Sequence, residues 1–553
     1  MAKAPLFFMA FFLIIFLFQE DSYGFIEGFD SPPLPDFEIT KQPGAISLDL
    51  TPTQDAIKRY LVFGPGQINN AYDEIKNLVY GINSNEEFFS VGIFSENKAT
   101  DLKLKGYSVV QDFPLDFYSK YVSTNAITKT SQVGNIANSE FVHNLYNVTG
   151  KGVTIAIMDT GVDFSNPDMI ESLARDENNY PIMLDPDGQG LVITNSTFAV
   201  KTSNYGIAKN FTKGDIGPPS GVTSTAYVSS DGVFLNNSIG NGTLISIYNS
   251  LYPHYGQNPV LTGQINGDMK IGKNSKDFIP TKSGIYHLGI ILAPQDGNVQ
   301  GVIVLVTDPN EAGVYDTIIP DMSTSWKDFT REKGKDPNYD FDFTDEIPIV
   351  LGSGNEFLLY DSDDDGIYDY SAGTIGARVV DVHGIFSKKS EIDDHLQAIN
   401  GTLLPAMDKD GRFFGIMTDF AGHGTASSST IVSKGIMKYD IYNDTKKYTI
   451  KGIAPDAKIL PIKSLWFGDV FYGWMWAVGF ESEDNKWVYT EKPKANIISN
   501  SWGVSGFPSL GYSPGLDILS HVLNALVMPQ SLHENYTGTT IISAAGNSGH
   551  GYG

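Results

Sequence analysis

Three polar residues stand where the side chains of an acyl-transfer site could lie. Asp159 follows the apolar run 153–158, His423 lies between two glycines, and Asn547 follows an Ala-Ala-Gly turn. An aspartate can orient an imidazole, an imidazole can transfer protons, and an amide can donate to a developing oxyanion. Each residue also has an ordinary interpretation: a capping aspartate, a structural histidine, and strand-to-loop chemistry for the asparagine.

The segments around these residues predict an α/β fold with a parallel sheet flanked by helices. Residues 153–158 form a nearly continuous apolar run, which is typical of a central parallel strand. Residues 496–499 and 541–543 predict two further strands, and the carboxyl ends of parallel strands are where such sheets place their sites. A Ser-rich helix is expected from His423 to about 434, and its N-terminus should keep the imidazole neutral.

Taken in order, the motifs resemble those of the subtilisin-like serine proteases (subtilases). They are Asp-Thr-Gly at 159–161, Gly-His-Gly-Thr at 422–425, Ser-Trp-Gly at 501–503 and Ala-Ala-Gly-Asn at 544–547, with Gly-Ile-Ala-Pro at 452–455. The resemblance covers about 138–170 and 405–553. It implies that Asp159 orients the imidazole, that His423 is general base and then general acid, and that Asn547 helps form the oxyanion hole.

The same resemblance implies a cleft for a peptide or protein substrate. The residues that would line it are Ser501, Trp502, Gly503, Ala545 and Gly546. The family's nucleophile lies in a Gly-Thr-Ser-Met-Ala type segment after the asparagine turn, and no such segment is present. We therefore expect the N-terminal part of a longer secreted serine endopeptidase, inactive as given. The alternative is a non-catalytic extracellular binding or surface-layer protein that retains the cleft.

A long stretch separates Asp159 from His423, whereas most subtilases keep these two residues close in sequence. Residues 170–405 are rich in Gly, Asn, Asp, Tyr and β-branched residues, and they predict a mostly β insertion, with clear strands at 285–292 and 301–306. A long insertion here resembles the pyrolysin-type subtilases. The peptidase domain is therefore expected at 133–553, interrupted by the insertion.

The N-terminal region predicts a signal peptide and a small separate domain. Lys3, an apolar run over 6–18 and a small-residue exit near Gly24 are typical of a secretory signal at 1–24. The run is shorter than the roughly 20 residues that span a bilayer, so we expect a secreted or cell-surface protein without a membrane span after signal removal. Several Asn-x-Ser/Thr sequons are compatible with glycosylation.

A leader or linker is expected at 25–57 and an α+β domain at 58–132. Strands are predicted at 58–63, 88–94 and 107–110, helices at 70–80 and 97–105, and an exposed joint at 117–135. The resemblance implies that this domain is the protein's own inhibitory propeptide. An independent adhesion or linker domain remains the alternative.

Composition limits the other possibilities. The net charge of −26 argues against a nucleic-acid partner, and the absence of cysteine excludes disulfides and thiolate metal sites. Acidic loops could instead bind Ca²⁺. Asp361, Asp363, Asp365 and Asp369, with Gly366, match the start of an EF-hand-type loop, although position 12 is Ala372. A solvated acidic turn is the alternative, and a second acidic cluster lies at 340–346.

Overall fold

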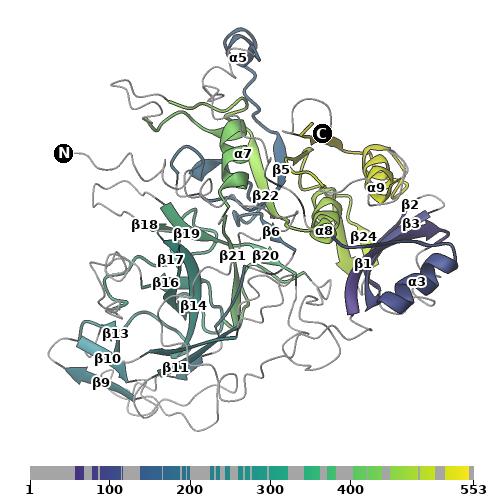
Figure 1. The fold of residues 1–553 in the computed structure, drawn as a ribbon. Helices are drawn as coiled ribbons and strands as arrows, with labels where there is room; N and C mark the ends of the chain where they lie inside the picture. The colour runs from purple at the N-terminus through teal and green to yellow at the C-terminus, as the bar shows by residue number, and fades with distance from the viewer. Residues whose placement is uncertain are drawn as a thin grey trace, which may run out of the picture.

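The structure is a computed structural model centred on a six-stranded parallel sheet in the order β20-β6-β22-β5-β25-β26 (Figure 1). Its strands are β5 (Thr154–Asp159), β6 (Leu184–Asp185), β20 (Arg378–Val379), β22 (Lys458–Lys463), β25 (Ile497–Asn500) and β26 (Thr540–Ser543). The predicted α/β class, with parallel strands ending at 159, 500 and 543, is confirmed.

The structure describes part of the chain between residues 57 and 546. The described residues are 57–67, 78–84, 87–113, 115, 117, 137–164, 166–186, 188, 190–194, 196–199, 225–229, 232–236, 243–248, 260–265, 268–274, 277–295, 298–321, 342–360, 370–380, 403–419, 421–438, 449–483, 486–504 and 517–546. The predicted signal peptide at 1–24 lies outside them. Among the described residues, no helix is long and apolar enough to cross a membrane.

Helices cover both faces of the parallel sheet, which explains its apolar strands. Ile155 and Ile157 of β5 share a buried cluster with Val432 of helix α7 (His423–Val432). Ala156 and Met158, which point to the other face, join the cluster formed by helices α8 (Phe467–Ala477) and α9 (Ile518–Val527). Alternate residues of one strand therefore enter two different cores.

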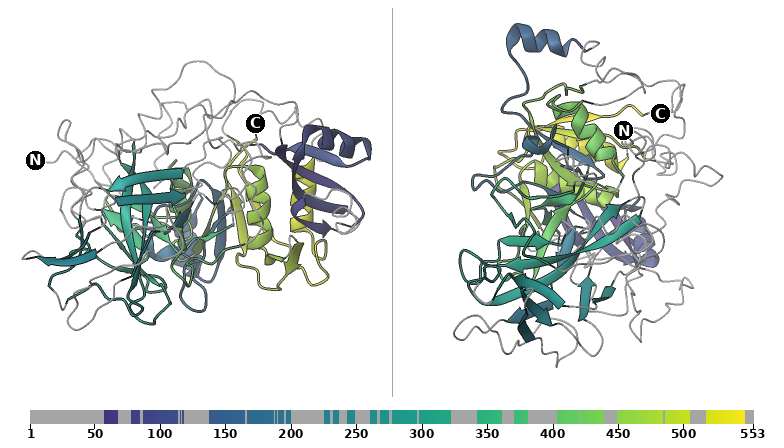
Figure 2. Two further views of the ribbon diagram at one scale, coloured as in Figure 1. Left: turned by 90° about the horizontal axis from the view of Figure 1, so that it is seen from below. Right: turned by 90° about the vertical axis from the view of Figure 1, so that its left-hand side faces the viewer.

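Along the chain, the strands of several antiparallel sheets come between β6 and α7. In space, these sheets lie at the opposite end of the molecule from the N-terminal sheet (Figure 2). Their strands are β7 (Leu191–Ile193), β8 (Ser196–Ala199), β9 (Thr225–Ser229), β10 (Gly232–Asn236), β11 (Thr243–Tyr248), β12 (Val260–Ile265), β13 (Asp268–Gly272), β14 (Ile285–Gln295), β15 (Asn298–Thr307), β16 (Thr317–Pro320), β17 (Ile349–Val350), β18 (Phe357–Tyr360), β19 (Tyr370–Ile375) and β21 (Phe413–Met417). β6 and β20 also lie within 170–405 but join the parallel sheet.

A small four-stranded sheet near the N-terminus packs on α8 and α9 (Figures 1 and 2). Its elements are β1 (Ile57–Pro65), β2 (Leu78–Ser84), β3 (Glu87–Ser95), helix α3 (Glu96–Leu104) and β4 (Ser108–Gln111). Leu61 and Phe63 of β1 face the main domain, whereas Tyr60 and Val62 face α3. This period of two gives the small sheet a core on each face.

Two expectations for this region differ from the structure. Of the helix predicted at 70–80, only 78–80 is described, and these residues begin β2. The joint predicted to be exposed from residue 117 onward begins with Phe117, which is only 6% exposed. Phe117 is buried because it lies against the main domain, a contact that local polarity cannot reveal.

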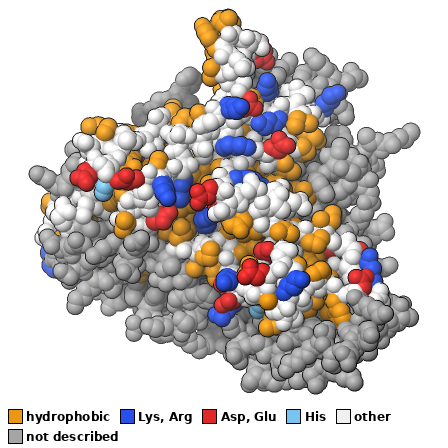
Figure 3. Space-filling model, turned by 180° about the vertical axis from the view of Figure 1, so that it is seen from behind, with side chains coloured by type: hydrophobic (Ala, Val, Ile, Leu, Met, Phe, Trp, Pro, Cys, Tyr) orange, Lys and Arg blue, Asp and Glu red, His pale blue; other side chains and the backbone are white. Residues whose placement is uncertain are grey.

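The remaining elements lie at the edges of the main domain. They are helix α5 (Ser139–Tyr146), the 3₁₀ turn η1 (Ile170–Ser172) and the hairpin β23 (Phe480–Glu483) with β24 (Lys486–Tyr489). α5 projects from the body, and its Phe141, Leu145 and Tyr146 are about 60% exposed (58–64%), forming the hydrophobic tip in Figure 3.

Candidate active site

Asp159 and His423 meet at the carboxyl edge of the parallel sheet. Asp159 is the last residue of β5, and His423 is the first residue of α7. Nδ1 of His423 lies 2.6 Å from Oδ1 of Asp159. Because a carboxylate only accepts, the proton sits on Nδ1 and the lone pair of Nε2 remains available. The Asp159 side chain is 1% exposed and the His423 side chain 24%, so the imidazole faces the solvent side of this pair.

A hydrogen-bonded frame around Asp419 holds the two side chains together. Oδ1 of Asp419 accepts from the Thr160 hydroxyl at 2.8 Å and from Gly422 N at 2.9 Å. Its Oδ2 accepts from the amide and the hydroxyl of Thr425 at 2.8 and 2.6 Å. The loop after β5 is thus fixed to the first turn of α7 through one buried carboxylate. Sequence reasoning missed this role, although the Asp-x-x-Gly-His spacing was visible.

The glycines of the two motifs allow the backbones to touch. A Cβ on Gly424 would stand 2.0 Å from the carbonyl oxygen of Gly161. Gly161 itself has φ +111°, and a Cβ there would stand 2.0 Å from the carbonyl oxygen of Thr418. A side chain at Gly424 would push α7 away from the loop after β5, and a side chain at Gly161 would push that loop away from Thr418. Gly424 therefore allows the close approach of Asp159 and His423, and Gly161 allows the Asp-Thr-Gly loop to pack against Thr418.

Two carboxylates decide the charge preference of the imidazole. Burial opposes protonation of His423, but its hydrogen bond to Asp159 and the charges of Asp159 and Asp419 outweigh burial and raise its pKa above the ordinary value. The helix N-terminus was expected to keep the ring neutral. The direction of the pKa shift is the opposite of that expectation, because the interactions with the two carboxylates favour the protonated ring.

We expect His423 and His287 to titrate at opposite ends of the histidine range. Burial lowers the pKa of His287 to about 4, whereas that of His423 is raised. Protonation of His423 therefore stabilises the folded state below its unfolded pKa of about 6.5, and this contribution is lost as pH rises through the raised value. NMR titration of the imidazole signals measures both. Equal midpoints for the two rings would contradict this assignment.

The predicted cleft residues follow the neighbouring strands of the same edge. Ser501, Trp502 and Gly503 follow β25, and Ala545 and Gly546 lie just beyond β26. β25 pairs in parallel with β5 and β26, with Asn500 beside both Met158 and Ser543. The structure therefore brings these two groups to the edge that holds Asp159. Asn547 lies outside the described residues.

Part of the main domain matches a known protein family. Residues 390–552 match the model of the subtilase family, described as Peptidase_S8. This part of the chain is similar to the subtilase family. The match contains His423 but not Asp159, so the hydrogen bond between them connects the subtilase segment to the β5 strand that precedes it.

One curated protein matches over a longer stretch of the chain, at low sequence identity. Pyrolysin of Pyrococcus furiosus is 22% identical over 428 residues, which cover 73% of this chain and 23% of pyrolysin. The chain therefore spans about a quarter of the length of the relative that it matches. No solved structure matches. These findings confirm the predicted resemblance to subtilases at the level of the family.

A segment after β4 pairs with the main domain and lies beside His423. The amide of Leu115 donates to Leu465 O at 2.9 Å, and the amide of Phe467 donates to Phe113 O at 3.0 Å, the pattern of an antiparallel pair. Phe117 then meets the His423 ring edge-on, with 5.5 Å between ring centroids. Phe113, Leu115 and Phe117, which we call the cleft segment, therefore lie against the main domain in the manner of an added strand. No sequence feature predicted this pairing.

The predicted calcium ligands remain predictions. Asp361, Asp363, Asp365 and Asp369 lie outside the described residues. Among the residues that are described, no group of three or more acidic or histidine side chains could hold a metal ion. In the second acidic cluster, Asp342 pairs with Lys270 and accepts from Thr344, which lowers its pKa despite burial.

Proposed function

We propose that this chain supplies the Asp and His of a secreted subtilisin-like serine endopeptidase. The observation that carries the proposal is the 2.6 Å contact between Asp159 and His423 at the carboxyl edge of a sheet that contains a subtilase segment. A nucleophilic serine would still be required, since no Gly-Thr-Ser-Met-Ala type segment follows Asn547 within these 553 residues. Residues 1–24 would direct secretion.

The geometry supports a specific division of roles. With its proton on Nδ1, His423 presents the Nε2 lone pair, which would accept the proton of the nucleophile and then return it to the leaving amine. Asp159, almost completely buried, would hold the ring orientation and stabilise the imidazolium. The amide of Asn547 would donate to the tetrahedral oxyanion, a type of contact worth several kcal/mol in the transition state.

The N-terminal sheet would act as the protein's own inhibitory propeptide. Its cleft segment pairs with residues 465–467 as an added strand, and Phe117 covers one edge of the imidazole. A substrate peptide would use the same backbone groups of Leu465 and Phe467. The uncleaved chain would therefore exclude substrate until residues 113–117 leave the cleft.

A comparison of this chain with a longer form tests the proposal. Residues 1–553 alone should not hydrolyse a fluorogenic peptide or react with a fluorophosphonate probe, because the acyl step needs a nucleophile. A longer form that joins these residues to a subtilase segment carrying the nucleophilic serine should do both after removal of the N-terminal sheet. A longer form that folds, loses that sheet and still fails to react would support the non-catalytic binding protein instead.

A further inference from the structure

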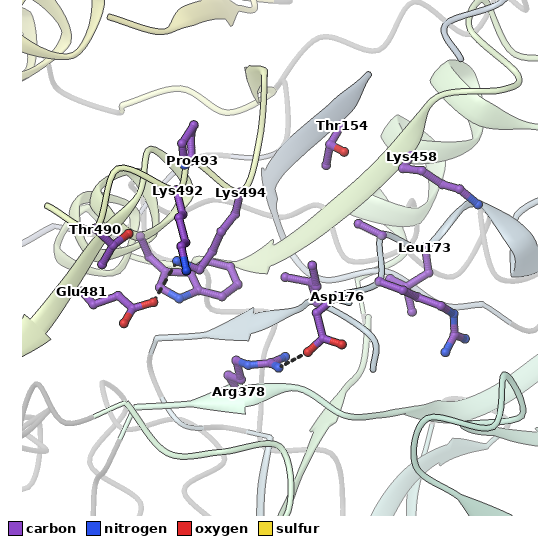
Figure 4. A pocket seen from close by; sticks show the side chains of 14 residues that line it. Thr154, Leu173, Asp176, Arg378, Lys458, Glu481, Thr490, Lys492, Pro493 and Lys494 are labelled. Carbon is purple, nitrogen blue, oxygen red and sulfur yellow. Dashed lines mark hydrogen bonds and ion pairs between the residues drawn. The ribbon is translucent and has the colours of Figure 1, made fainter. Parts of the chain in front are cut away.

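A cavity of about 750 Å³ opens at the amino edge of the parallel sheet. Thr154 and Lys458, which line it, are the first residues of β5 and β22, whereas Asp159 ends β5. Thr154 and Asp159 are five residue steps apart along β5, a distance of about 17 Å. The cavity, which we call the basic pocket, is therefore distinct from the proposed active site. Figure 4 shows the side chains that line it.

The basic pocket carries the opposite charge from the chain as a whole. Five cationic and two acidic side chains line it, a local excess of three positive charges in a protein of net charge −26. The cations are Arg175, Arg378, Lys458, Lys492 and Lys494, and the acids are Asp176 and Glu481. Segments far apart in sequence contribute them, so the cluster results from folding.

The cations of the basic pocket differ in how closely they pair with nearby carboxylates. Arg175 makes a bidentate pair with Glu356, with distances of 2.9 and 2.8 Å, so its charge is fully used. By contrast, Arg378 to Asp176 and Lys494 to Glu481 are single contacts of 3.2 Å, longer than a strong charge-assisted bond (Figure 4). Lys492 is solvent-exposed at the rim.

The surroundings of these cations oppose their charge. Burial lowers the pKa of Arg378, with Asp176 opposing the shift, and burial likewise lowers that of Lys494, against Glu481 and with help from Arg378. Burial and the charges of Lys434 and Arg175 lower the pKa of Lys458. Burial is the largest cause of each shift and the nearby acids offset it only in part, so an anion entering the basic pocket beside these cations would be stabilised.

The geometry points to a binding site for a multivalent oxyanion, of the phosphate or sulfate class, between Arg378, Lys458, Lys492 and Lys494. A tetrahedral oxyanion accepts several hydrogen bonds at once and can bridge side chains that separate carboxylates leave weakly paired. The Trp476 ring, 5.1 Å below Lys494 Nζ, gives the pocket an apolar wall that suits the body of an ester.

An occupant would connect separate parts of the fold. Arg378 begins β20, Lys458 begins β22, and Lys492 and Lys494 lie in the loop before β25. A bound oxyanion would join these segments and favour the folded state without touching Asp159 or His423. Binding should therefore raise the melting temperature.

Calorimetric titration of the full chain tests the site, with inorganic phosphate and sulfate as probes at constant ionic strength set by NaCl. We expect saturable binding of at least one anion, weakened about tenfold or more by Lys494→Gln and by Lys492→Glu. Lys492 is exposed, so its variant should fold normally. Lys98→Gln, a similar loss of charge on exposed α3, is the control and should bind as the unaltered chain does.

Glucose 6-phosphate and glucose 6-sulfate, with glucose as the neutral control, distinguish a free anion from an ester. Tighter binding of an ester than of the inorganic anion, or the reverse, both support the site and identify the source. The site would be refuted if NaCl at the same ionic strength competed as well as phosphate or sulfate, so that no binding specific to these anions remained. Equal affinity in all variants, or no heat with any probe, would also refute it.

Discussion

Asp159→Asn should lower kcat for peptide hydrolysis by about 10⁴-fold in the nucleophile-containing form, the loss seen when this aspartate is changed in other serine peptidases. The reason lies in the 2.6 Å contact with Nδ1 of His423. An asparagine amide can donate to Nδ1, which leaves the proton on Nε2, where the lone pair is needed. It also removes the buried charge that favours the imidazolium. Steady-state kinetics with a fluorogenic peptide measures the effect.

A second readout of the same substitution needs no nucleophile. In residues 1–553, Asp159→Asn should lower the pKa of His423, because the hydrogen bond and charge of Asp159 help to raise it. Asp456→Asn, which removes a carboxylate that is 50% exposed, is the matched control and should change neither quantity. If Asp159→Asn retained kcat within tenfold and left the His423 titration unchanged, the dyad would not be the catalytic pair.

Much of the site could be predicted because its signals are local. An apolar run covered on both faces ends at Asp159, and glycines flank His423. Gly424 is required by the 2.0 Å contact that a Cβ would make with Gly161 O, so the motif records a packing constraint. The strands of the small sheet were likewise visible as runs of β-branched and aromatic residues.

The features that sequence reasoning missed depend on contacts between distant segments. Phe117 follows a strand that would fit any small domain, and only folding places it against His423. The charge preference of the imidazole depends on Asp419 as well as Asp159, and its direction follows from their distance and burial. The basic pocket combines cations from four segments, none of which is unusually basic by itself.

Arg59→Met should destabilise the attachment of the N-terminal sheet by about 3–5 kcal/mol, the usual cost of removing one partner of a buried ion pair. Arg59 of β1 is 3% exposed and pairs through Nε with Asp112. Its Nη1 lies 3.0 Å from Asp469 Oδ1 on α8, close enough for ion pairing although not aligned as a hydrogen bond. Without the cation, two buried carboxylates face each other across the interface.

Asp112 makes this interaction specific to the docked arrangement. Its Oδ1 accepts a hydrogen bond of 2.9 Å from Gly468 N, in the first turn of α8. In the chain, Asp112 immediately precedes the cleft segment. If cleavage follows the opened population, limited proteolysis should therefore release the sheet about 150- to 5,000-fold faster in Arg59→Met, which corresponds to the loss of about 3–5 kcal/mol.

Arg412→Met, which removes an arginine paired with Asp410 at 56% and 62% exposure, is the control and should change stability by less than about 1 kcal/mol. Adding Asp112→Asn to Arg59→Met should recover part of the loss, because it removes one of the two facing charges. Equal proteolysis rates in Arg59→Met and the unaltered chain would show that apolar packing of Leu61 and Phe63 alone holds the sheet in place.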